Sequence, residues 1–486
     1  MKTNTIARES LGVFGDFRLD QTGRLFLQRV LEKKKLKINC LTNNRAEEVR
    51  FHRFIWNEKM TLDKMQKEIF SKTNELAKDV EHILAIQDSS ELNFDCRRNE
   101  IKGLGVTKNN KSVGLFIHPV LAIDASDNFV LGLAANHMWS WDPNRTKRTS
   151  HERYSADLED KDSYRWIKCA EEAKLNLNYA KKITFISDRE SDIYAMFTRI
   201  PDSKTNILIR SKQDRYILVN EEKDKLINYI NHLKVEDEKI LFVPKQSKRD
   251  LRQQSLSNKI DGIIKIREER KANLELRFGS FRIPRPRDNK EENYLISIPL
   301  FVVDVHEKST TLKENEKIHW RLITTHSVMT ADQAWEIVEF YRKRWTIEQF
   351  FRAAKKGGLK LEEIESTQGK YIEKLAFIGL VATIKILQLT YCRDQNFFRL
   401  ATTIFSSQEI IVLNKLKKKY QGKTTAQKNP FKKNTVPWAY WIVGRHGGWK
   451  GYASEGPAGP IIIKRGLDEL QKNLDGIRLF GLVCMT

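Results

Sequence analysis

Two short apolar segments that each end on an aspartate restrict the fold of this chain more than any other feature. The first, 82–88, reads His-Ile-Leu-Ala-Ile-Gln-Asp, and the second, 183–188, reads Ile-Thr-Phe-Ile-Ser-Asp. Continuous apolar runs of this length predict buried β-strands. The sequence therefore predicts that Asp88 and Asp188 stand at the ends of two buried strands.

The residues between these strands predict a hairpin and a helix. Apolar segments at 113–123 and 129–134 flank a cluster of turn-forming residues at 124–128, which indicates a hairpin. A helix is expected at about 164–179. The resulting order of strand, hairpin, helix and strand indicates an α/β protein with a mixed sheet.

A third acidic residue stands on a late helix. The helical pattern runs unbroken from Ala331 to Lys355, and Gly357-Gly358 ends it. At roughly 100° per residue, four polar side chains of this helix fall within about 60° of one another; they are Tyr341, Arg344, Glu348 and Lys355. A carboxylate flanked by a phenol and two cations suits a metal ion held against a phosphate, although a solvated helix face has the same composition.

Together the three acids suit a pair of metal ions. Asp88, Asp188 and Glu348 offer the hard oxygen ligands that Mg²⁺ prefers, and the chain has no CxxC or Cys/His zinc spacing. Two Mg²⁺ ions roughly 4 Å apart, with Mn²⁺ as a plausible substitute, would activate a water or a 3′-hydroxyl and stabilise the leaving oxygen at phosphorus. The pattern therefore indicates a metal-dependent nuclease.

The charge balance favours a polyanionic partner. The 486 residues include 86 Lys and Arg against 63 Asp and Glu, which leaves a net charge of +23. Each Lys or Arg that meets a phosphate releases a condensed counterion and gains affinity for nucleic acid. The five cysteines are far apart, no apolar leader opens the chain, and the longest apolar stretch, 375–384, is too short to span a bilayer. We expect a soluble cytoplasmic protein with reduced thiols and no membrane partner.

Basic helices at both ends of the chain admit two interpretations. Short helices expected between Ser10 and Lys72 carry Lys33–Lys35 and several arginines, which suits contact with a DNA groove. An ordinary amphipathic subdomain is an equally good interpretation. The basic residues between Lys417 and Lys433 suit either DNA contact or a solvated linker.

The three acids and the late helix carry a resemblance to a known family. The spacing Tyr341-x2-Arg344-x3-Glu348-x6-Lys355 resembles the Y-R-E-K signature of the bacterial cut-and-paste DDE transposases of the insertion-sequence-four family, of the Tn-five type. Segments 84–90 and 187–193 resemble the two catalytic strands of that family. Further similarity at 53–55, 438–440 and 474–476 extends the resemblance over nearly the whole chain, with a departure at Gln87, where relatives often carry an acid.

This resemblance implies an RNase H-like catalytic core interrupted by a β-rich insertion, with α-helical N- and C-terminal domains. The implied boundaries are a transposon-end-binding domain at 1–75, the first part of the core at 76–205, the insertion at 206–328, the end of the core at 329–370 and a dimerisation domain at 371–486.

The resemblance also implies a role for each candidate residue. Asp88, Asp188 and Glu348 would ligate two Mg²⁺ ions. Five residues would hold DNA phosphates around the scissile bond, namely Tyr341, Arg344, Lys355, Arg210 and Lys212. Trp320 would receive an unstacked base and Trp345 would wedge into the duplex, although a tryptophan in a strand or helix is more often part of the core.

The implied activity is DNA transposition in a bacterial, nucleoid-associated setting. A homodimer would bind the inverted transposon ends, cut them through a 3′ nick, a hairpin and hairpin opening, and join them to target DNA. Two alternatives stay open: an RNase H-like nuclease or junction resolvase that does not join strands, and a DNA-binding regulator that has lost catalysis.

Overall fold

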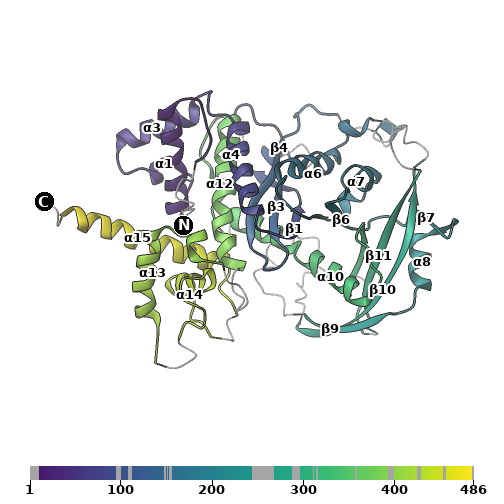
Figure 1. Cartoon of the computed structure of the whole chain (residues 1–486). Coiled ribbons are helices and arrows are strands. Elements are labelled where there is room, and N and C mark those ends of the chain that lie inside the picture. Colours follow the sequence, from purple (N-terminus) through teal and green to yellow (C-terminus); the bar gives the residue numbers. More distant parts are fainter. Residues whose placement is uncertain are drawn as a thin grey trace. The chain divides into compact units, whose positions relative to one another are not determined.

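Twelve β-strands and the helices around them make up the part of the chain that the computed structural model describes (Figure 1). The described residues are 10–94, 100–107, 112–146, 149, 151–152, 156–243, 268–286, 296–309, 311–313, 316–355, 358–391, 399–423, 428–452 and 456–483. Contacts divide the chain into two units, the first comprising Met1–Phe185 and Lys343–Thr486 and the second Ile186–Arg342. The predicted α/β class is confirmed.

The first unit contains a small sheet and most of the helices. Its strands are β1 (Ile83–Gln87), β2 (Ser90–Asn93), β3 (Gly114–Asp124), β4 (Val130–Trp139) and the start of β5 (Ile183–Ser187). Its helices are α1 (Phe17–Lys33), α2 (Ile38–Leu41), α3 (Arg45–Trp56), α4 (Leu62–Ala77), α6 (Tyr164–Asn176), α11 (Trp345–Ala354), α12 (Gly369–Tyr391), α13 (Ser407–Tyr420), α14 (Val436–His446) and α15 (Pro460–Val483).

Strand β3 is the centre of this sheet. All eleven of its residues are buried, as the continuous apolar run predicts. It forms the predicted antiparallel hairpin with β4, and on its other side it pairs with both β1 and β2. The pairs Gln87↔Val120 and Ser90↔Ile117 belong to one antiparallel register, which is interrupted only at the two residues between β1 and β2.

Strand β4 is covered along its outer edge by amide side chains. Within the described residues β4 forms a ladder only with β3. Gln66 of α4 donates a hydrogen bond to the Asn136 carbonyl at 2.7 Å, and Asn176 of α6 donates to the Ala134 carbonyl at 2.8 Å. Gln388 of α12 donates to the Val130 carbonyl in the same way. These bonds satisfy strand carbonyls that would otherwise pair with another chain.

Polar caps define the helices near the two ends of the chain. The side chains of Asp16, Asn44 and Thr61 accept backbone N–H groups at the starts of α1, α3 and α4, and Ser406 forms a capping box with Glu409 at the start of α13. Helix α1 packs against α12 and α15 within the first unit. The short helices expected in 10–72 are therefore confirmed.

Helices α13 and α15 contain residues whose role depends on their place in the helix. Helix α13 ends with the basic run Lys417–Lys419, and cations are favourable at the negative end of a helix. Helix α15 spans Pro460–Val483. Gly466 lies inside α15 at its crossing with α14, where a Cβ would overlap the Val443 carbonyl oxygen. This glycine is required for close helix packing and does not end the helix.

Lys34 makes the stability of the first unit depend on pH. Its side chain is buried next to Lys385, Glu409, Lys464 and Asp468. Burial is the main cause that lowers the pKa of Lys34 to about 7, and the positive charge of Lys385 is the second. An unfolded chain keeps a lysine pKa of about 10.4. Between these two values the unfolded state binds more protons, so the free energy of unfolding should rise as the pH increases from about 7 to about 10.

We expect Lys34→Met to remove most of this rise, as measured by urea unfolding at pH 7 and pH 9.5. The exposed neighbour Lys35 supplies the control, because Lys35→Met should keep the wild-type pH dependence. An unchanged rise in Lys34→Met would contradict the assignment.

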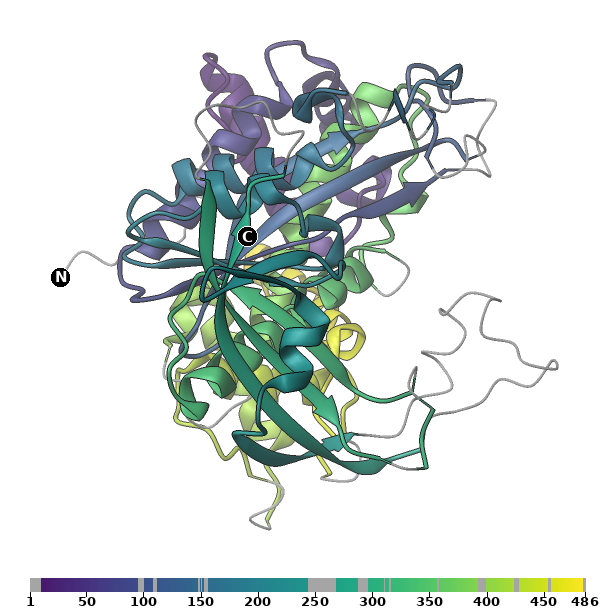
Figure 2. The ribbon, with the colours of Figure 1, turned by 90° about the vertical axis from the view of Figure 1, so that its right-hand side faces the viewer.

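The second unit is rich in β-structure. Its strands, in the teal-to-green part of Figure 2, are β6 (Thr205–Arg210), β7 (Tyr216–Val219), β8 (Glu222–Lys225), β9 (Asp237–Val243), β10 (Arg270–Pro284), β11 (Ser297–Glu307) and β12 (His319–Thr324). They follow the order β6-β12-β11-β10-β7-β8, and β9 pairs with β10. The helices are α7 (Tyr194–Arg199), α8 (Leu226–His232) and α10 (Ala331–Arg342).

Two further predictions concern the cysteines and membrane contact. Cys40 and Cys169 are free thiols, while Cys96, Cys392 and Cys484 lie outside the described residues. None of the helices in the described ranges combines the length and the apolar character needed to cross a bilayer.

Candidate active site

Asp88 stands where the β1–β2 ladder with β3 is interrupted. The register of Gln87↔Val120 and Ser90↔Ile117 places Pro119 of β3 opposite Asp88. A proline has no N–H to donate to the ladder. The backbone N–H of Ser89 instead donates to Asp88 Oδ1 at 2.8 Å, and the Asp88 side chain is one-quarter exposed. The predicted buried strand that ends just before Asp88 is confirmed.

The helix predicted from Ala331 to Lys355 is interrupted, so the prediction of one continuous helix is wrong. Helix α10 ends at Arg342 and α11 begins at Trp345. At the junction the N–H groups of Thr346 and Ile347 bond to the carbonyls three residues earlier. No glycine or proline marks this point. Lys343 instead donates to the Ala125 carbonyl at 2.6 Å, which fixes the start of α11 to the turn between β3 and β4.

The interruption also divides the four polar residues of the predicted line. Tyr341 belongs to α10 and the second unit, whereas Arg344, Glu348 and Lys355 belong to the first unit. Glu348 lies in the first turn of α11, one turn after Arg344, and Lys355 caps its end. Trp345 opens α11 with 57% of its surface exposed.

Arg344 joins two of the three predicted acids. Its Nη1 lies 3.0 Å from Asp88 Oδ2, and its Nη2 lies 2.5 Å from Glu348 Oε1. The guanidinium is itself largely buried, with 14% of its side chain exposed. Two carboxylates held this close would repel each other without a cation between them. The structure thus gathers Asp88, Arg344 and Glu348 around one positive charge.

Asp188 lies in the second unit, at the start of a 3₁₀ turn, Arg189–Ser191. Its carboxylate accepts the Arg189 N–H at 2.8 Å. Four residues later, Asp192 is buried, bonds to Arg215, and accepts the backbone N–H of Lys212 at 2.7 Å. Asp192 therefore fixes the loop that presents the exposed Lys212 side chain.

Three other candidates also lie in the second unit. Arg210 donates to the His319 carbonyl at 2.9 Å. The rings of Trp320 and Tyr341 are 6.4 Å apart and tilted, and the Tyr341 ring is buried. Trp320 also lines a cavity of about 320 Å³ between β9 and α10, together with Trp335 and Lys239. Lys239 lies over the Trp335 ring at 4.6 Å. Trp320 is therefore half-buried beside a cavity.

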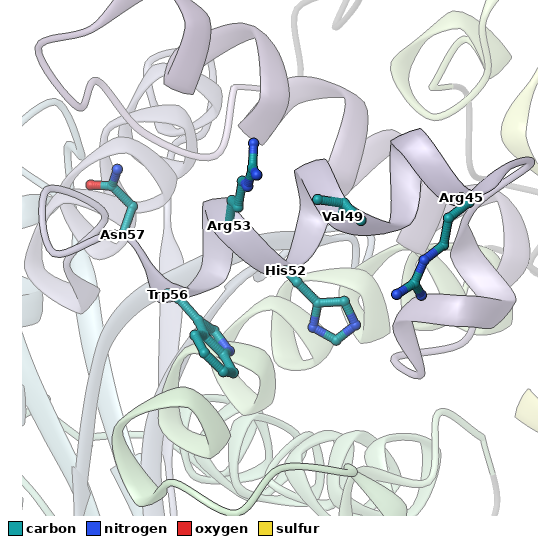
Figure 3. Close-up of a pocket in the computed structure, with 6 residues that line it drawn as sticks. All are labelled: Arg45, Val49, His52, Arg53, Trp56 and Asn57. Atoms are coloured by element: carbon teal, nitrogen blue, oxygen red, sulfur yellow. The ribbon is translucent and has the colours of Figure 1, made fainter.

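Helix α3 presents an exposed basic and aromatic face (Figure 3). Arg45, His52, Arg53 and Trp56 project from it around a shallow hollow of about 410 Å³. Trp56 is 60% exposed and stacks on Tyr371 of α12 at 5.5 Å with the rings nearly parallel. Lys374 of α12 donates to the carbonyls of Ile55 and Asn57, which fixes the end of α3.

The residues around Arg344 have the chemistry that Mg²⁺ requires, since carboxylate oxygens are its preferred protein ligands. Within the described ranges, no group of three or more His, Cys, Asp or Glu side chains could hold a metal ion. In the first unit, Asp88 and Glu348 are two carboxylates that bond to the same Arg344 side chain. The comparison with protein families finds no family model that matches this chain.

Sequence reasoning missed residues whose signal exists only in three dimensions. His118 and Arg165 contact the neighbours of Asp88, and Trp335 lines the cavity beside Trp320. Each stands in a segment that reads as an ordinary strand or helix. In the sequence, His118 and Pro119 stand out only as a histidine and a proline inside an otherwise apolar strand.

Proposed function

We propose that this chain is a DDE-type DNA transposase with an RNase H-like core, in which Asp88, Asp188 and Glu348 ligate two Mg²⁺ ions. The proposal is supported most by Arg344, which holds Asp88 and Glu348 together although Asp88 and Arg344 are 256 residues apart in the chain. It requires that the two units bring Asp188 of the second unit to the same place.

In this proposal Arg344 keeps the two carboxylates of the first unit in position before metal binding. When bound, the two ions would supply Lewis acidity at the scissile phosphate and an activated water or 3′-hydroxyl. Arg344 would then leave the carboxylates and contact the phosphate. The phosphates around the scissile bond would also be held by Lys355, Arg210, Lys212 and Tyr341. One set of acids would serve 3′ nicking, hairpin formation, hairpin opening and strand transfer, because each is an in-line displacement at phosphorus.

The face of α3 is the part of the first unit best suited to transposon-end DNA. It combines exposed cations with a stacked, exposed Trp56, and α12 fixes its end. Arginines on a helix of this kind contact phosphates or base edges in a major groove. A homodimer would then hold the two ends of one element. The net charge of +23 supports the same class of partner.

We expect Arg53→Ala to weaken binding to end DNA and to reduce the slope of log K against log salt concentration by about one charge. The measurement is fluorescence anisotropy over a salt series. Lys67→Ala on α4 is a matched control, because Lys67 is similarly exposed and pairs only locally with Asp63. Equal slopes for wild type and Arg53→Ala would exclude α3 as the DNA face.

The experiment that tests the function uses a supercoiled donor plasmid carrying the DNA that flanks this gene. With Mg²⁺ or Mn²⁺, excised ends and joined target products are expected, and Asp188→Asn should form neither. Nicked or linear products without joining would favour the alternative, an RNase H-like nuclease or resolvase. No cleavage under either metal, with end binding intact, would contradict both enzymatic functions.

A further inference from the structure

His118 lies behind the first catalytic aspartate of the proposed site. It occupies β3 next to Pro119, and the register of β1 and β2 with β3 places it opposite Ser89. Its imidazole is fully buried against the edge of Trp166, at 4.6 Å and nearly perpendicular. No residue of the proposed metal site touches this ring through a described hydrogen bond, so its role must be indirect.

The two ring nitrogens of His118 bind the two residues that flank Asp88. Nδ1 lies 2.7 Å from Ser89 Oγ, and Nε2 lies 3.2 Å from Gln87 Oε1. Gln87 is itself fully buried. One rigid side chain thus anchors the position before Asp88 and the position after it.

A neutral His118 ring can make both contacts. An amide oxygen only accepts, so Nε2–H donates to Gln87 Oε1, and the unprotonated Nδ1 accepts from Ser89 Oγ–H. The Ser89 oxygen in turn accepts from Arg165 Nε–H, at 2.9 Å. Burial holds the pKa of His118 well below its ordinary value, which favours this neutral form.

The network reaches the carboxylate of Asp88 through the backbone of Ser89. Ser89 N–H donates to Asp88 Oδ1 at 2.8 Å, while Arg344 bonds to Oδ2 at 3.0 Å. Because Pro119 interrupts the ladder at this point, strand pairing alone does not orient Asp88. The side-chain bonds to His118 replace it.

We propose that His118 is a positioning residue that aims the Asp88 carboxylate at the metal ions, acting through Ser89 and Gln87. This inference rests on the proposed function. Removing a residue that orients the ligands of a metal ion typically lowers metal affinity or activity by about 10- to 100-fold.

The test compares His118→Phe, His118→Gln and a control in full-length protein. Phenylalanine keeps the contact with Trp166 but removes both hydrogen bonds, so we expect the Mg²⁺ concentration for half-maximal DNA cleavage to rise about 10- to 100-fold. Glutamine can still donate to Gln87 Oε1 and should recover part of the loss. The control is His137→Phe, because His137 pairs with His118 across the β3–β4 hairpin but stacks on Trp139.

A readout that does not depend on cleavage is the affinity for Mn²⁺, measured by electron paramagnetic resonance. We expect this affinity to fall in His118→Phe, whereas end-DNA affinity should stay at the wild-type value. Wild-type metal dependence in a folded His118→Phe would overturn the positioning role. If that variant does not fold, Ser89→Ala removes the same link from a partly buried position, and its wild-type metal dependence would overturn the proposal equally.

Asp88→Asn, assayed in parallel, separates the two proposals. If Asp88→Asn cleaves DNA normally, the proposed function itself fails. If Asp88→Asn is inactive and loses Mn²⁺ binding while His118→Phe behaves as wild type, only the role of His118 fails.

Discussion

Glu348→Gln is expected to lower Mg²⁺-dependent cleavage of transposon-end DNA by at least about a thousandfold, which corresponds to about 4 kcal/mol in the activation free energy. The substitution keeps the size of the side chain and its position in the first turn of α11 but removes the negative charge that a metal ligand requires. The measurement is the single-turnover rate of strand cleavage at saturating protein and Mg²⁺.

Two further measurements make this result specific to the metal site. End-DNA affinity and the far-UV circular dichroism of Glu348→Gln should match the wild type, because the amide oxygen can still accept from Arg344. Glu363→Gln is the matched control, since Glu363 is an exposed glutamate that pairs locally with Lys360, and it should cleave normally. Cleavage by Glu348→Gln within tenfold of wild type would remove Glu348 from the proposed active site.

We expect the thermal stability of Arg344→Ala to depend more strongly on divalent metal ions than the thermal stability of the wild type. Without the guanidinium, Asp88 and Glu348 lose charge-assisted hydrogen bonds and repel each other, which we expect to cost about 1–3 kcal/mol in the metal-free protein. A divalent cation can replace the missing charge. The increase in melting temperature caused by Mg²⁺ or Mn²⁺ should therefore be larger in Arg344→Ala than in the wild type.

Differential scanning calorimetry with and without a saturating concentration of Mg²⁺ or Mn²⁺ measures this difference directly. Arg342→Ala serves as the control, because Arg342 pairs with Glu339 on α10 and should show the wild-type metal effect. An identical metal-induced shift in Arg344→Ala and wild type would show that cations do not bind between Asp88 and Glu348. Cleavage should fall in Arg344→Ala in either case, so calorimetry is the discriminating measurement.

The secondary structure near the site followed from local patterns with few exceptions. The apolar run before Asp88 forms β1, and the turn cluster at 124–128 joins β3 to β4. These elements form mainly because they bury apolar side chains, and the pattern of apolar residues can be recognised in the sequence. The break after Arg342 carries no glycine or proline signal in the sequence; next to it, Lys343 bonds to the carbonyl of Ala125, which is distant in sequence.

Local sequence patterns are sufficient to predict the α/β character, the strand that ends at Asp88 and the position of Glu348 one helical turn after Arg344. The folded chain is needed to see that Arg344 bonds to Asp88, that Pro119 stands opposite this aspartate, and that His118 contacts both of its neighbours. Local patterns report burial and backbone preference within a few residues. Strand register and hydrogen bonds between distant side chains depend instead on how the elements pack, so they exist only in the folded protein.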